Sequence, residues 1–114
     1  MIENIHKNAA AGRWYKMSLS EQMGNIGSEV GRAINWEKKG NLIQRDRALD
    51  RAFDLFDITL DDDRWKDFSG RLKEICRARE ILADTFWGNR FYGDTPEKLE
   101  KYFFQFAVAA RSER

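Results

Sequence analysis

The chain has 114 residues, 34% of them charged, with a formal net charge of +1 and one cysteine, Cys76. This length indicates one domain that can bury a core without disulfides or metal, and the balanced charge excludes a strongly basic or acidic surface field. Residues 1–13 predict a flexible N-terminal tail, and residues 14–114 a single domain. With no signal-peptide pattern and no apolar run long enough to cross a membrane, we expect a cytoplasmic protein that does not bind membranes.

The first predicted helix covers residues 19–39. Ser18 and Glu21 have the spacing of a capping box, and apolar residues recur behind them at helical intervals. Gly40 follows two lysines, which is typical of a helix end.

Three more amphipathic segments follow, over residues 42–60, about 65–87 and 96–110. Asn41 caps the first of them and Thr95 caps the last. The chain has one proline and no alternating apolar and polar run, which argues against strands. The sequence therefore predicts an all-α fold, an antiparallel four-helix bundle.

Three glycines interrupt the best of these helices: Gly24, Gly27 and Gly31. Each costs a helix about 1 kcal/mol relative to alanine. At about 100° per residue they share one side of the helix. We therefore predict close packing against this strip by an aromatic of the last helix, by Phe91 and Tyr92, or by another subunit.

The helix over 65–87 carries an arginine on its apolar stripe. A buried Arg79 needs an acidic partner, and Glu29, in the middle of the first helix, is the candidate for a buried ion pair. Cys76 lies on the same stripe with no base in view, which favours a buried structural thiol over a nucleophile.

Three apolar side chains point away from the predicted core: Trp36, Phe104 and Val108. Exposed apolar residues that gather in a patch mark an interface. They predict a homo-oligomer or a contact with another protein.

Aspartates recur along one face of the helix over 42–60, at positions 46, 50, 54, 57 and 61. Such a row is a solvated face, a contact for a partner's basic surface, or a Mg²⁺ site. The single histidine, His6, lies in the tail, which excludes di-iron, histidine-zinc and Ser–His or Cys–His sites. We assign no catalytic, metal-binding or cofactor-binding residue.

Basic residues gather around the start of the helix over 65–87. Phosphate contacts there would use this set: Arg64, Lys66, Arg71, Lys73 and Arg77. Acidic residues interleave with them, so the basic character is weak for a nucleic-acid interface.

The segment Trp14–Met23, continuing through Asn25–Val30, resembles a family of small, functionally unassigned bacterial proteins known mostly as hypothetical. The likeness extends through Arg71–Glu74 and Lys101–Phe103 and implies an all-helical, four-helix fold without a known activity. The architecture is also similar to four-helix accessory proteins of diversity-generating retroelements, which are oligomeric, bind nucleic acid and are strongly basic, unlike this chain.

These patterns favour a non-enzymatic helical interaction or scaffold module that self-associates. The first alternative is a nucleic-acid-binding accessory protein that uses the basic residues. The second is a Mg²⁺-dependent hydrolase that uses the aspartate row.

Overall fold

The computed structural model describes residues 12–66, 69–88, 93 and 95–113. All regular structure in these residues is helical, so the predicted all-α class is confirmed. The helices are α2 (Leu19–Lys38), α3 (Leu42–Leu60), α4 (Asp63–Lys66), α5 (Ser69–Trp87) and α6 (Pro96–Ser112).

Local signals begin and end these helices as predicted. Ser18 Oγ accepts a hydrogen bond from the Glu21 amide at 3.1 Å, and the Glu21 carboxylate accepts one from the Ser18 amide at 3.1 Å. Asn41 caps α3 and Thr95 caps α6 through their side-chain oxygens. Gly40 follows α2 with φ +78°, a conformation that favours glycine.

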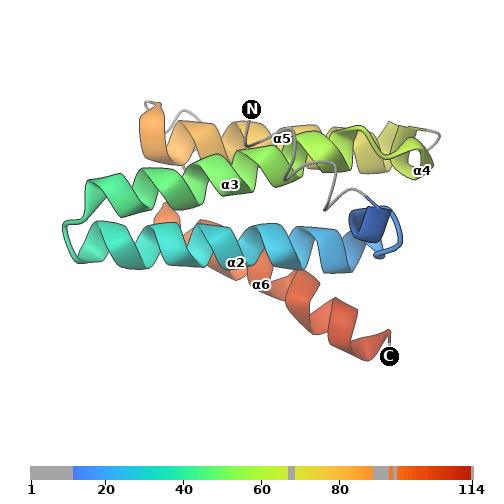
Figure 1. Ribbon diagram of the computed structural model, residues 1–114, viewed down its shortest axis with the longest axis horizontal. Coiled ribbons are helices and arrows are strands. Elements are labelled where there is room, and N and C mark those ends of the chain that lie inside the picture. The colour runs from blue at the N-terminus through green and yellow to red at the C-terminus, as the bar shows by residue number, and fades with distance from the viewer. Residues whose placement is uncertain (1–11, 67–68, 89–92, 94, 114) are drawn as a thin grey trace.

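The helix α2 lies at the centre of the packing. Figure 1 shows α2 and α3 side by side, α5 running along α3, and α6 crossing α2 before its C-terminal end leaves the other helices. The contact between α5 and α6 is small compared with those that α2 makes with α3 and α6. The core is formed mainly by Met23, Ile26, Val30, Leu49, Phe56, Ile75, Leu82, Leu99 and Phe103.

The helix predicted over 65–87 corresponds to two helices. The described residues contain the single turn α4 and then α5, with residues 67–68 between them outside the description. The buried positions of α5 are Ile75, Ala78, Leu82 and Thr85, an i, i+3, i+7, i+10 series. This face is rotated away from the one predicted, because the small residues Ala78 and Thr85 point inward.

The predicted N-terminal tail over residues 1–13 stays a prediction. Residues 1–11 lie outside the described residues, as do Phe91 and Tyr92 of the loop before α6. Residues 12–14 form a helical turn, and the Trp14 side chain is buried in the core with 4% of its surface exposed. Trp14 therefore packs with the core of the described helices.

Candidate functional site

A buried polar cluster occupies the end of the molecule where α2 begins. The Gln22 amide nitrogen donates to the Trp14 carbonyl at 2.8 Å and to the Asp62 carboxylate at 3.0 Å, and its oxygen accepts from the Trp65 indole at 2.8 Å. The Trp14 indole donates to Thr59 Oγ at 2.8 Å. All five side chains are buried. Because these groups satisfy one another, the cluster stabilises the fold rather than binding a ligand.

Asp62 carries the charge of this cluster. Arg64 donates hydrogen bonds to both carboxylate oxygens of Asp62, from Nε at 3.0 Å and from Nη2 at 2.7 Å. The Arg64 backbone amide also donates to the Asp62 carboxylate, at 3.1 Å. Burial alone would raise the pKa of Asp62, but the hydrogen bonds from Arg64 and Gln22 outweigh burial and lower it. The ionised form is therefore favoured in the folded protein.

The glycine strip of α2 faces α6. A Cβ added at Gly27 would lie 2.6 Å from the Phe103 Cβ, and one at Gly24 would lie 3.4 Å from the Ala107 Cα. At Gly31 the nearest atom is a carboxylate oxygen of Glu100, at 3.7 Å. Of the three neighbours expected from the sequence, the structure places an aromatic residue of the last helix, Phe103, against the strip.

A shallow hollow of 210 Å³ remains between α2 and α6 beside this contact. Gly24, Ser28 and Gly31 form one side, and Phe104 and Ala107 form the other. We call the surface made by this hollow and the adjoining Val108 side chain the Phe104 face. It combines a projecting ring with a neighbouring depression.

Two of the three predicted interface residues lie on the Phe104 face. Phe104 is 60% exposed and Val108 is 42% exposed. Trp36 is only half-buried, lies under the Lys39 ammonium at 5.2 Å, and is displaced along α2 beyond Gly31. It does not extend this surface, because the antiparallel register of α2 and α6 places it near the start of α6.

The predicted buried pair of Arg79 and Glu29 is wrong. Arg79 lies beside α3, with Nε 3.3 Å from Asp57 Oδ1 and its guanidinium over the Phe53 ring. Glu29 instead pairs with Arg32 and with Arg51 at 2.7 Å. The rotation of α5 explains the difference, because Arg79 lies at the edge of the buried face, where its side chain is 39% exposed.

The prediction of a buried Cys76 is also wrong, since its side chain is exposed. The same rotation moves position 76 to the outside of α5. Exposure alone does not make a thiol reactive.

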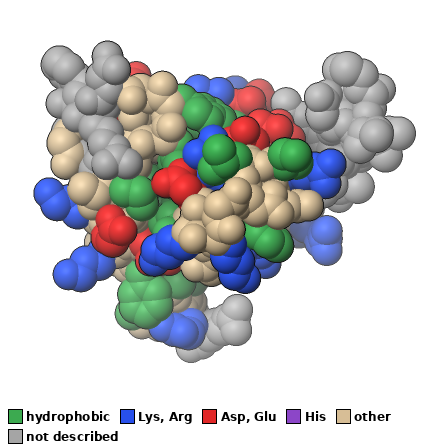
Figure 2. All heavy atoms as spheres, turned by 90° about the vertical axis from the view of Figure 1, so that its left-hand side faces the viewer, with side chains coloured by type: hydrophobic (Ala, Val, Ile, Leu, Met, Phe, Trp, Pro, Cys, Tyr) green, Lys and Arg blue, Asp and Glu red, His purple; other side chains and the backbone are tan. Residues whose placement is uncertain are grey.

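The five predicted nucleic-acid contacts are divided by the fold. Arg64 is committed to Asp62, and Lys66 lies 3.3 Å from Asp63 and 3.7 Å from Asp61. The Arg64 and Arg71 guanidinium groups both lie over the Trp65 ring, 4.5 and 5.3 Å from its centroid. The remaining two, Lys73 and Arg77, border a pocket farther along α5. Figure 2 shows the opposite end of the molecule, at the α2–α3 connection, where cations and anions are interspersed with apolar side chains.

The aspartate row of α3 is divided among separate contacts. Asp46 pairs with Arg45, Asp57 with Arg79, and Asp61 accepts a hydrogen bond from Tyr15. In the part of the chain that the structure describes, no group of three or more His, Cys, Asp or Glu residues is arranged to hold a metal ion. The geometry therefore favours a charged outer face for this row.

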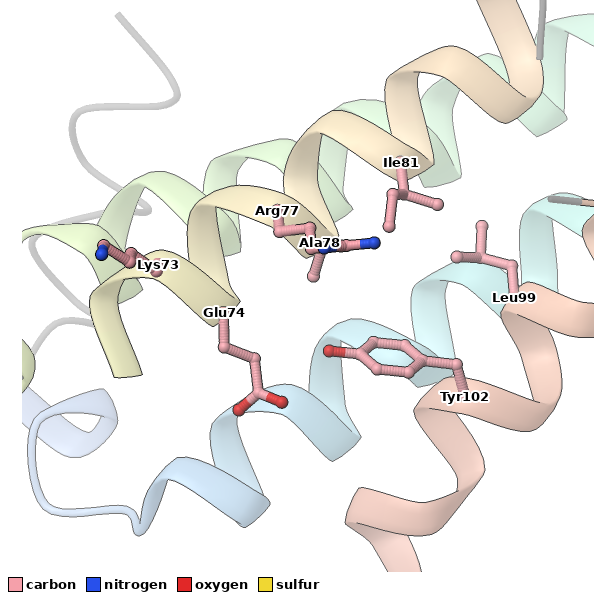
Figure 3. Close-up of a pocket in the computed structure, with 7 residues that line it drawn as sticks. All are labelled: Lys73, Glu74, Arg77, Ala78, Ile81, Leu99 and Tyr102. Carbon is pink, nitrogen blue, oxygen red and sulfur yellow. The ribbon is translucent and has the colours of Figure 1, made fainter. Parts of the chain in front are cut away.

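A second opening lies between α5 and α6, two helices that have only a small contact with each other. It has a volume of 360 Å³ and a mostly apolar lining that includes Ala78, Ile81 and Leu99 (Figure 3). Tyr102 borders it from α6, and burial raises the pKa of Tyr102 to about 12, with a further increase from Glu74 and a decrease from Arg77. This pocket leaves no signal in the sequence, because it depends on the spacing between two helices.

Comparison with known proteins finds no family model, no curated protein and no solved structure that matches this chain. The resemblance to a bacterial family therefore stays a prediction. Among the described helices, none is both long and apolar enough to cross a membrane.

Proposed function

We propose that the protein is a non-enzymatic interaction module, built as an antiparallel four-helix bundle, that self-associates through the Phe104 face. The observation that carries this proposal is the position of an exposed aromatic ring directly beside a depression floored by small residues. Each copy thus supplies both a projection and a recess, which is the requirement for a two-fold symmetric contact.

The charges along the outer side of α6 support an antiparallel pairing of two copies. At about 100° per residue, the side chains within about 40° of Phe104 around the helix are Glu97, Glu100, Val108 and Arg111. The stripe therefore runs from acidic through apolar to basic. When the α6 helices of two copies pair in antiparallel orientation, Glu100 of one copy lies opposite Arg111 of the other.

The same register brings Phe104 of one copy opposite Ala107 of the other. Ala107 is small and its backbone is already close to Gly24, so the Phe104 ring finds a recess rather than a side chain. Burying an exposed aromatic side chain is a large part of the favourable free energy of a small interface.

The two alternatives have weaker support. A nucleic-acid interface would need Arg64 and Lys66, whose charges are offset by Asp61, Asp62 and Asp63. A Mg²⁺-dependent hydrolase would need converging carboxylates, whereas the α3 aspartates are distributed among several basic partners.

Sedimentation velocity over a range of concentrations tests the proposal. We expect the wild type to show a concentration-dependent dimer and Phe104→Glu to sediment as a monomer, because each interface would then bury two unpaired carboxylates. Ile43→Glu is the matched control, because Ile43 is also an exposed apolar residue, 69% exposed, and lies at the start of α3. We expect this replacement to leave the dimer intact.

Charge reversal tests the orientation. Glu100→Arg and Arg111→Glu each weaken association by placing like charges opposite one another, and the double variant restores it. A wild type that stays monomeric at the highest concentration reached, or a Phe104→Glu variant that dimerises normally, contradicts the proposal.

A further inference from the structure

The pocket between α5 and α6 is separate from the Phe104 face. Its inner wall is apolar and uses Ala78 and Ile81 of α5 and Leu99 of α6. Its volume of 360 Å³ lies at the lower end of the range of about 300–1,000 Å³ for small-molecule sites. A pocket of this size suits a compact ligand with one branched or aromatic group.

Two opposite charges stand at the mouth of this pocket. In Figure 3, the Glu74 carboxylate lies on one side of the Tyr102 hydroxyl and the Arg77 guanidinium on the other. Lys73 also lines the pocket, and its side chain extends away from these two charges. Glu74 and Arg77 are three residues apart on α5, a spacing that allows an ion pair. Within the described residues, however, the structure records no ion pair between them. Both charges border the pocket.

We propose that this pocket binds a small zwitterion with an apolar body, of the chemical class of the apolar α-amino acids. The ligand carboxylate pairs with the Arg77 guanidinium and accepts a hydrogen bond from the Tyr102 hydroxyl. The ligand ammonium group donates to Glu74. The apolar side chain occupies the space beside Ala78, Ile81 and Leu99.

The charge pattern excludes simpler ligands as the best fit. A carboxylate without an ammonium group would leave Glu74 facing an added negative charge, and an amine without a carboxylate would leave Arg77 facing an added positive charge. A zwitterion satisfies both side chains, since its own charges are neighbours. The half-buried surroundings of Tyr102 strengthen each of these contacts.

Titrations followed by two-dimensional NMR of the full chain test this inference. L-Phenylalanine is expected to shift the amide signals of α5 and α6 around the pocket in a saturable way, with the weak affinity of a ligand this small. Two related compounds each lack one charged group: 3-phenylpropanoate lacks the ammonium group, and 2-phenylethylamine lacks the carboxylate. We expect both to bind more weakly than L-phenylalanine by about tenfold or more, because each loses one charged hydrogen bond. Glycine lacks the apolar body and causes no saturable shift.

Three variants identify the groups that bind. Arg77→Gln and Glu74→Gln each weaken L-phenylalanine binding by about tenfold or more. Lys101→Gln removes an exposed positive charge of α6 that does not line the pocket, and we expect it to leave binding unchanged. All three positions are exposed, so the variants are expected to keep the wild-type melting temperature, which circular dichroism verifies.

Four results would overturn the inference. These are no saturable shift with L-phenylalanine, equal binding of 3-phenylpropanoate, equal binding of 2-phenylethylamine, and equal loss of binding in Lys101→Gln and Arg77→Gln. The dimer test at Phe104 is independent of these outcomes, because it concerns a different side of α6.

Discussion

Asp62 connects three parts of the chain that are distant in sequence. Its carboxylate binds Gln22 of α2 and Arg64 of α4, and Gln22 in turn holds the Trp14 carbonyl and the Trp65 indole. The side chain is 3% exposed, so its charge is stabilised by these donors rather than by water.

The effect of Asp62 on stability depends on pH. Because its pKa is lower in the folded protein than in the unfolded chain, its contribution is complete above the ordinary value of 3.8 and is lost as the pH falls through the lowered pKa. We expect Asp62→Asn to cost about 1.5–3 kcal/mol at pH 7, the range for hydrogen bonds to charged groups. Melting temperatures between pH 7 and pH 2 should therefore fall less steeply for Asp62→Asn than for the wild type.

Asp63→Asn provides the control for this measurement. Asp63 is the adjacent carboxylate, its side chain is 94% exposed, and its contact with Lys66 is a surface pair of little energetic value. Its melting curve should follow the wild type at every pH. An Asp62→Asn protein with the same acid sensitivity as the wild type would show that the carboxylate does not act in this way.

At the level of helices, the contact of α2 with α6 is set by one glycine more than by the other two. Replacing a glycine inside a helix by alanine normally stabilises the helix by about 1 kcal/mol. At Gly27 this gain is opposed, because the new methyl group would lie 2.6 Å from Phe103 Cβ, closer than real side chains come.

We therefore expect Gly27→Ala to lower the melting temperature, and Gly27→Leu to lower it further, since α6 must move away from α2. The matched control is Gly31→Ala, on the same strip, where the methyl group meets only a carboxylate oxygen at 3.7 Å and the helix gains stability. Thermal unfolding by circular dichroism measures both changes. If Gly27→Ala and Gly31→Ala both raised the melting temperature, Gly27 would not be needed for the close packing of α2 against α6.

The helices themselves were predictable because their signals are local. The Ser18–Glu21 capping box and the caps at Asn41 and Thr95 depend on partners within one turn. The apolar stripe of α2 was likewise clear, and its five central members from Met23 to Ile34 are buried.

The rotation of α5 was not predictable in the same way. Its sequence offers two overlapping faces, one through Cys76 and Arg79 and one through Ala78 and Thr85, and small residues give no strong hydrophobic signal. The choice between them depends on how α5 packs against α3. The partner of Arg79 depends on the same packing, and so does the pocket beside α6.

The inward turn of Asp62 was hidden for a related reason. The run of acidic residues at positions 61–63 predicts a turn, but all three look alike in sequence. Only the position of Gln22, forty residues earlier in the chain, and the three-dimensional placement of the two indole groups distinguish the buried carboxylate from its exposed neighbours.

At the scale of the whole molecule, the helices are not held equally. The centre is α2, which packs along α3 and α6, whereas α5 is attached chiefly to α3 and leaves an opening towards α6. A helix held along one side can separate from the rest at a lower free energy than complete unfolding requires.

We therefore expect a local unfolding step in which α5 detaches while α2, α3 and α6 stay together. Native-state hydrogen exchange would detect it: the amide of Ile75 or Leu82 should exchange with a lower opening free energy than that of Ile26 or Val30, although all four side chains are equally buried. A single shared opening free energy would instead mean that the chain unfolds as one cooperative unit. A ligand seated between α5 and α6 would slow exchange in α5 selectively, so the rate at which this helix opens would report occupancy of the pocket.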